Sequence, residues 1–204
     1  MKSMPDDLIN IFDEISNEFS ELYLHWQIYK QLFGHNRERI DLLNKTAGLF
    51  FTVVHNSLFY DVQLRIAKLI DPAVSGRNKN KKDENLSLQL LIKKIELSED
   101  VKFANSLNKS FDELKSRCEN IILNRKKLIA HNDLETAISK TELHSGISRS
   151  LISDVLNKIS IFLNEINGYY LDTEVNYENI ISDDGETLIE IIKHGHKYIE
   201  SRDN

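Results

Sequence analysis

The scarcity of chain-breaking residues is the feature that most limits what this sequence can fold into. Its 204 residues include only 7 glycines and 2 prolines, whereas average usage predicts about two dozen in a chain of this length. Turns and strand ends depend on these two residue types, so a chain with few of them has few places to reverse its direction. The sequence is therefore expected to be mostly helical.

Apolar residues recur every three or four positions over several long stretches, as amphipathic helices require. The pattern predicts helices over residues 8–33, 40–70, 86–95, 98–131 and 147–170, and a further helical pattern covers residues 188–199. The sequence shows neither strand-like alternation nor a repeat of fixed period. We therefore expect an all-α fold, an up-and-down bundle of four long helices with additional short helices.

Charge is distributed unevenly along the chain. The net charge is −6, but residues 1–33 carry −4 and residues 172–204 carry −6, which leaves +4 for the residues between them. A mildly basic centre permits an anionic ligand without predicting one. We expect a helical bundle over residues 1–172 and an acidic C-terminal helical extension over residues 173–204.

The sequence favours the cytoplasm over a membrane or an exported protein. No stretch approaches the run of about 18 apolar residues that a membrane span needs, and the N-terminal segment has no export signal. The single cysteine, Cys118, lies on the apolar face of the helix expected over residues 98–131 and is interpreted as a buried hydrophobic residue. We expect a cytoplasmic protein with no membrane partner.

Motifs of the common metal and cofactor sites are missing from the sequence. It has no glycine-rich phosphate loop, no G-x-S-x-G elbow and no H-E-x-x-H motif. Glu190 and His194 are spaced for one helix face, but two ligands do not make a metal site. We therefore expect no metal and no cofactor.

One residue breaks the pattern of the helix expected over residues 98–131. At about 100° per residue, Arg125 falls near the middle of the apolar stripe, where a guanidinium needs a partner. That partner is either an interior carboxylate or helix end, which makes Arg125 structural, or a ligand anion in a cleft. His131 follows after a rise of about 9 Å and a rotation of about 240°. To direct both side chains at one phosphate, the helix end must distort or a second subunit must complete the site.

The residues around Arg125 and His131 resemble a known family. The segment NRKKLIAHND at 124–133 closely resembles the R-x(4–6)-H signature of HEPN-domain proteins, in its R-x-K-x-I-A-H-x-D form. Upstream, FFTVVHNSLFYDVQLRIAKLIDP at 50–72 and ENLSLQLLIKKI at 84–95 are similar to the preceding helices of the AbiU-type abortive-infection branch. The resemblance covers about residues 40–135. It implies a helical bundle that dimerises and, in active members, cleaves RNA without metal.

The resemblance also assigns roles to individual residues. Arg125 would stabilise phosphate charge, and His131 would act as general base or acid on the ribose 2′-hydroxyl, leaving a 2′,3′-cyclic phosphate. A dimer would bring two such pairs into one cleft and so form a composite active site. The expected substrate-binding residues flank the pair in the sequence: Asn124, Lys126, Asn132 and Asp133.

Two of these positions depart from the family pattern. Lys126 stands where many active members carry Asn, Asp or His, and a lysine still binds phosphate. Asp133 stands where the branch paired with nucleotidyltransferase antitoxins has a tyrosine, so regulation by modification of that position is not implied. Asp133 either orients His131 or caps the helix.

Three functions are compatible with these features. The first is a metal-independent HEPN ribonuclease that acts in phage defence or as a toxin, with RNA, a second copy of the chain and a cognate antitoxin or regulatory protein as partners. The second is a catalytically inactive bundle that binds RNA or a nucleotide, or docks a partner protein. The third is a helical interaction protein in which Arg125 is structural.

Overall fold

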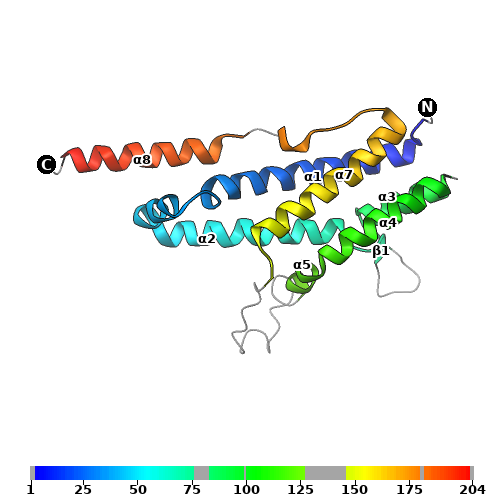
Figure 1. The fold of residues 1–204 in the computed structure, drawn as a ribbon, viewed down its shortest axis with the longest axis horizontal. Coiled ribbons are helices and arrows are strands. Elements are labelled where there is room, and N and C mark those ends of the chain that lie inside the picture. Colours follow the sequence, from blue (N-terminus) through cyan, green and yellow to red (C-terminus); the bar gives the residue numbers. More distant parts are fainter. Residues whose placement is uncertain (1–2, 76–82, 99, 127–145, 180–181, 203–204) are drawn as a thin grey trace. The chain divides into compact units, whose positions relative to one another are not determined.

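Helices make up almost all of the structure (Figure 1). The computed structural model describes residues 3–75, 83–98, 100–126, 146–179 and 182–202, and it confirms the prediction of an all-α, HEPN-like bundle. No helix among these residues is both long and apolar enough to cross a membrane.

Internal contacts divide the chain into two units. The larger comprises Met1–Ser20 and Gln63–Tyr177, and the smaller comprises Glu21–Val62 and Glu178–Asn204. The division expected from charge, between residues 172 and 173, stays a prediction. Helix α1 (Asp6–Phe33) and helix α2 (Arg37–Leu69) each contribute residues to both units.

The ends of α1 match the sequence signals. The helix begins directly after Pro5 and ends before Gly34. A Cβ atom on Gly34 would lie 2.6 Å from the carbonyl oxygen of Lys30, which is closer than any side chain tolerates. Only glycine therefore fits where the chain leaves this helix.

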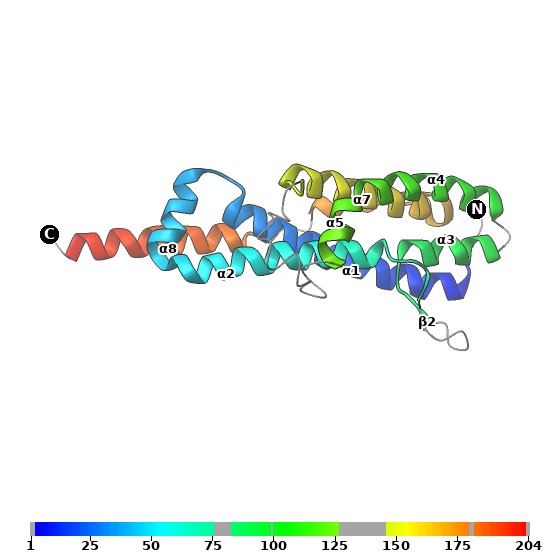
Figure 2. The ribbon, with the colours of Figure 1, turned by 90° about the horizontal axis from the view of Figure 1, so that it is seen from below.

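Three further helices build the core of the larger unit: α3 (Leu88–Leu97), α4 (Val101–Arg117) and α7 (Arg149–Leu171). Helix α4 packs against both α3 and α7 (Figure 2). Burial of each large apolar side chain is worth about 1.5–3 kcal/mol. The fully buried members of this core include Phe19, Leu88, Leu91, Ile95, Phe111 and Phe162.

The long helix expected over residues 98–131 is divided in the structure. Helix α4 ends at Arg117, and α5 (Glu119–Asn124) begins two residues later. Cys118 between them has a ψ of 0°, outside the helical range. It is fully buried, as predicted, and burial raises the pKa of its thiol to about 12. The thiol is therefore protonated and unreactive at neutral pH.

A short antiparallel ladder follows α2. Strand β1 (Val74–Ser75) pairs with β2 (Asp83–Glu84), so that Val74 lies opposite Glu84. The sequence predicts only a solvated loop over residues 73–84, because strands of two residues are too short to leave a periodic pattern.

The smaller unit contains the C-terminal part of α1, the first part of α2 and helix α8 (Asp184–Arg202), which follows the 3₁₀ turn η2 (Tyr177–Asn179) in the chain. Helix α2 is interrupted at Ala47, whose φ of −160° and ψ of 66° are not helical. The ring of Tyr29 lies 5.3 Å from that of His55, and its hydroxyl lies 3.0 Å from Nε2 of His55. Aromatic contacts thus join α1 to α2 within this unit.

Helix α8 exposes much of the apolar pattern that predicted it. Ile189 is fully buried, whereas Leu188, Ile191 and Ile199 are 39%, 62% and 58% exposed. The period of these residues predicts the helix correctly, but it does not indicate which of its sides is packed.

Candidate functional site

The predicted site begins where α5 ends, in the larger unit. Asn124 is the last residue of α5, and Arg125 and Lys126 continue it as a wider, π-type turn. Such turns are frequent at functional sites because they redirect neighbouring side chains. The three side chains lie in three different environments.

Arg125 forms an ion pair with the end of α2. Its Nη1 donates a hydrogen bond of 2.5 Å to Oδ1 of Asp71. The side chains of Arg125 and Asp71 are 27% and 29% exposed, so the pair lies near the surface and both partners are partly open to solvent. The partner of Arg125 is therefore a carboxylate, but a partly exposed one and not an interior one: Asp71, 54 residues away in the chain.

Asn124 is bound to the same helix but lies in the core. Its Nδ2 donates a hydrogen bond of 2.5 Å to Oε1 of Gln63, and the two residues are 1% and 0% exposed. Among the described residues, no donor binds Oδ1 of Asn124. Asn124 therefore connects α5 to α2 through a buried hydrogen bond, and its role in substrate binding stays a prediction.

The turn that carries Asp71 is itself held in place. Asn85 donates through Nδ2 to the carbonyl oxygen of Pro72 at 2.7 Å, and through its backbone N–H to that of Ala73 at 2.9 Å. The N–H of Ala73 in turn donates to Oε1 of Gln89 at 3.0 Å. These bonds connect the end of α2 to the start of α3 and limit the movement of Asp71.

Two grooves adjoin these residues. Asp71 lines a cleft of about 360 Å³ together with Arg65, Lys68 and Glu84. Lys126 is exposed and lines a different groove of about 370 Å³ with Lys115 of α4. Asp71 and Lys126 therefore line different grooves, and Arg125 is not among the described residues that line either of them.

The remaining predicted residues, His131, Asn132 and Asp133, lie outside the described residues, so their roles stay predictions. Conversely, no sequence pattern indicates Asp71 or Gln63 as a site residue. The Asp71-Pro72 dipeptide indicates only the end of a helix, and neither residue belongs to a recognised motif.

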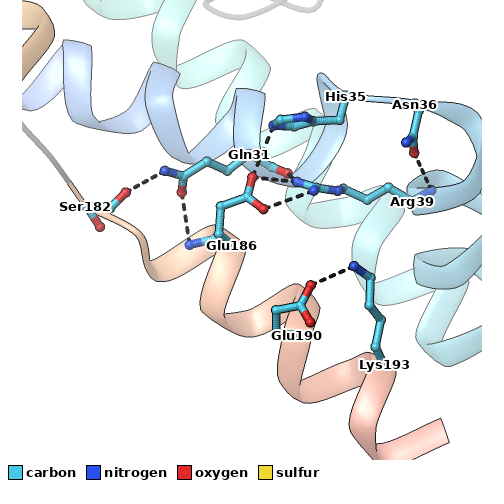
Figure 3. Close-up of polar contacts among 9 residues, drawn as sticks. Gln31, His35, Asn36, Arg39, Ser182, Glu186, Glu190 and Lys193 are labelled. Atoms are coloured by element: carbon cyan, nitrogen blue, oxygen red, sulfur yellow. Dashed lines mark hydrogen bonds and ion pairs between the residues drawn. The ribbon is translucent and has the colours of Figure 1, made fainter. Parts of the chain in front are cut away.

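Arg39, in the smaller unit, differs from Arg125 because its guanidinium makes several hydrogen bonds. Nη1 and Nη2 of Arg39 donate to the two carboxylate oxygens of Glu186 at 2.7 and 3.0 Å, and Nη1 also donates to the carbonyl oxygen of Gln31 (Figure 3). His35 lies 3.1 Å from the same carboxylate, and Gln31 accepts a hydrogen bond from the N–H of Gly185. This cluster binds the start of α8 to α1 and α2.

Glu186 is expected to make stability depend on pH. Its hydrogen bonds from Arg39 hold the pKa of the Glu186 carboxyl below its ordinary value. The resulting stability is present in full above the unfolded-state pKa of about 4.3 and is lost as the pH falls through the lower folded-state pKa. We expect Glu186→Gln to reduce the free energy of unfolding at pH 7, as measured by denaturant titration, and to have a smaller effect at pH 3.

The matched control is Glu190→Gln, since Glu190 forms an exposed pair at 2.6 Å with Lys193 of the same helix. This substitution should change the free energy of unfolding less than Glu186→Gln does at pH 7. An effect of Glu186→Gln that is equal at pH 3 and pH 7 would contradict the assignment.

Glu190 and His194, the two potential metal ligands on α8, do not belong to a larger cluster of such residues in the described part of the chain. Glu190 is bound to Lys193 (Figure 3). Within the described parts of the chain, no group of three or more His, Cys, Asp or Glu side chains is arranged to hold a metal ion.

The fold and the R-x(5)-H segment, which begins in the sequence directly after α5, define a helical bundle of HEPN type. A family model described as AbiU2, of the HEPN group, matches residues 5–191. The chain therefore belongs to the AbiU2 family of HEPN proteins, and this membership suggests a HEPN-type function in abortive infection. No curated protein matches the chain, and no solved structure matches it either.

Proposed function

We propose that this protein is a metal-independent endoribonuclease of HEPN type that acts in abortive infection or as a toxin. Arg125 binds the phosphate of the scissile RNA linkage, and His131 transfers protons. RNA is the substrate, and a second copy of the chain completes a composite active site. A cognate antitoxin or regulatory protein is proposed as the controlling partner.

The polar contacts and the exposure of the Arg125 guanidinium are the observation that supports this proposal. Among the described residues, its polar contact is the single bond from Nη1 to Asp71. A guanidinium has five N–H donors in a rigid fork, so the contact with Asp71 by itself leaves donors that can bind an anion. With the side chain 27% exposed, a phosphate can reach it and be bound by two parallel hydrogen bonds.

The reaction uses the nucleophile of the substrate. A general base removes the proton of the ribose 2′-hydroxyl, whose oxygen forms a bond to the adjacent phosphorus. The bond from phosphorus to the 5′-oxygen breaks, and a general acid protonates that oxygen. The products are a 2′,3′-cyclic phosphate and a 5′-hydroxyl. Histidine suits both proton transfers because its pKa is near neutrality, and Arg125 stabilises the charge that develops on the phosphoryl oxygens.

The proposal is tested by incubating the purified full chain with RNA in excess EDTA. We expect cleavage into fragments that end in 2′,3′-cyclic phosphate and begin with a 5′-hydroxyl, which end-group analysis distinguishes from other products. Cleavage that EDTA abolishes would contradict the metal-independent mechanism. If the chain binds RNA without cleaving it, the inactive binding module is the correct function.

The composite site is tested by the solution mass of the chain. We expect a homodimer at micromolar concentration in light scattering or sedimentation. A strict monomer that still cleaves RNA would show that one chain contains the complete site.

A further inference from the structure

We infer that Asp71 is a positioning residue for Arg125: it holds the guanidinium by one edge and so presents the remaining donors to the RNA phosphate. This inference rests on the proposed ribonuclease function. It adds a residue from the end of α2, outside the R-x(5)-H segment, to the machinery of the site.

The contact between the two residues supports this role through its geometry. The hydrogen bond of 2.5 Å joins one nitrogen, Nη1, to one oxygen, Oδ1. A single contact of this kind restrains Nη1, while the Nη2 edge makes no polar contact with any described residue. A bidentate pair would use both terminal nitrogens and leave little of the fork for a ligand.

Arg39 shows how a purely structural arginine is bound in this protein. Its two terminal nitrogens are paired with both oxygens of Glu186, Nη1 also donates to a backbone carbonyl, and the side chain is only 13% exposed (Figure 3). Arg125 differs in both respects, because it has one contact to a described residue and twice the exposed fraction. The comparison favours a guanidinium of Arg125 that is accessible to a ligand over one that is enclosed by protein contacts, as in Arg39.

Both partners of the contact are held by other bonds. Asp71 is in the turn that Asn85 and Gln89 hold to the start of α3, and Arg125 follows Asn124, which is bound in the core to Gln63 of α2. The contact therefore joins two fixed backbone segments. A catalytic arginine held in one orientation before substrate binds loses less conformational entropy in the reaction.

The charge of Asp71 predicts opposite effects on binding and on rate. A carboxylate beside Arg125 repels a phosphate, so removal of its charge should leave RNA affinity unchanged or strengthen it. Loss of orientation should slow cleavage, because a misplacement of about 1 Å costs on the order of 100-fold in rate. A residue that serves only as a counter-ion would change affinity and leave the rate unaltered.

The experiment measures single-turnover RNA cleavage in EDTA and, separately, the affinity for a 2′-O-methyl RNA that cannot be cleaved. We expect Asp71→Asn to lower the cleavage rate between about 10- and 100-fold, with equal or tighter binding of the 2′-O-methyl RNA. Asp71→Glu keeps the charged acceptor and should lie between the wild type and Asp71→Asn. In an Arg125→Ala background, Asp71→Asn should have no further effect on the rate.

Glu84→Gln is the matched control, because Glu84 lines the same cleft as Asp71 but binds Lys93 and Lys94 at 3.6 and 3.5 Å. Its rate should stay within about twofold of the wild type, as for surface substitutions away from a site. The inference is overturned if Asp71→Asn behaves like Glu84→Gln, or if it slows cleavage equally with and without Arg125. A wild type that does not cleave RNA overturns the proposed function itself, and the inference with it.

Discussion

Substitution of His131 by alanine should nearly abolish RNA cleavage. A positioned general acid or base contributes on the order of 10²- to 10⁴-fold to a rate, and this reaction needs a proton removed from the 2′-hydroxyl and one delivered to the 5′-oxygen. If His131 performs these transfers, His131→Ala lowers the single-turnover rate in EDTA by that factor. The affinity for a 2′-O-methyl RNA should change much less, because the imidazole contributes little to binding of the phosphate backbone.

The pH profile gives an independent test of the same assignment. An imidazole near its ordinary pKa of about 6.5 changes its protonation state across the neutral range. The wild-type rate should therefore depend on pH between about 5 and 8, and the residual rate of His131→Ala should lose this dependence. His194→Ala is the control, since His194 is an exposed histidine of α8, and it should retain both the rate and the profile. Cleavage that survives His131→Ala would contradict the mechanism.

Substitution of Arg125 by alanine should have the second-largest effect, with loss of activity and little loss of stability. Removal of one donor to the developing phosphoryl charge costs on the order of 10²- to 10³-fold in rate. The ion pair with Asp71 is partly exposed on both sides, and such pairs contribute no more than about 1 kcal/mol to the free energy of unfolding. The melting temperature should therefore fall by only about 2–4 °C.

RNA cleavage and melting temperature together distinguish a functional role of Arg125 from a structural role. A large fall in melting temperature with unchanged RNA cleavage would make Arg125 a structural residue and favour the helical interaction protein. Arg125→Lys keeps the charge but loses the planar fork, so it should recover only part of the rate. Arg117→Ala is the matched control: this arginine of α4 is 61% exposed and lies 3.9 Å from Asp154, and its loss should leave cleavage near the wild-type rate.

Only part of the candidate site could be predicted from the local sequence around Arg125. The order of residues 124–126 and the anomaly of a charged residue on an apolar stripe both pointed to Arg125, and the structure confirms that its guanidinium has a carboxylate partner. Asn124 and Lys126 are predicted to bind substrate because they are adjacent to Arg125 in the sequence. In the folded chain Asn124 is buried against Gln63, whereas Lys126 lines a separate groove. Adjacent residues on a helix point in different directions, so adjacency alone does not make a site.

The helix expected over residues 98–131 shows a second limit. Its apolar period continues from α4 into α5, because both segments present the same kind of residue to the core. The backbone nevertheless leaves the helical conformation at Cys118, and the period gives no sign of it, since a local change of ψ leaves the order of apolar residues unaltered. The position of Arg125 on the apolar stripe, which assumes one straight helix over residues 98–131, therefore does not carry across Cys118.

The sequence by itself determined the class of fold, the ends of α1 and the family. These properties follow from local signals: the helical period of apolar residues, the positions of Pro5 and Gly34, and the R-x(5)-H segment. Only the tertiary structure decided that Arg125 binds Asp71, that Asn124 binds Gln63 in the core and that α8 exposes much of its apolar pattern. Such contacts join residues more than 50 positions apart, and they depend on how the helices pack, which no local pattern of residues encodes.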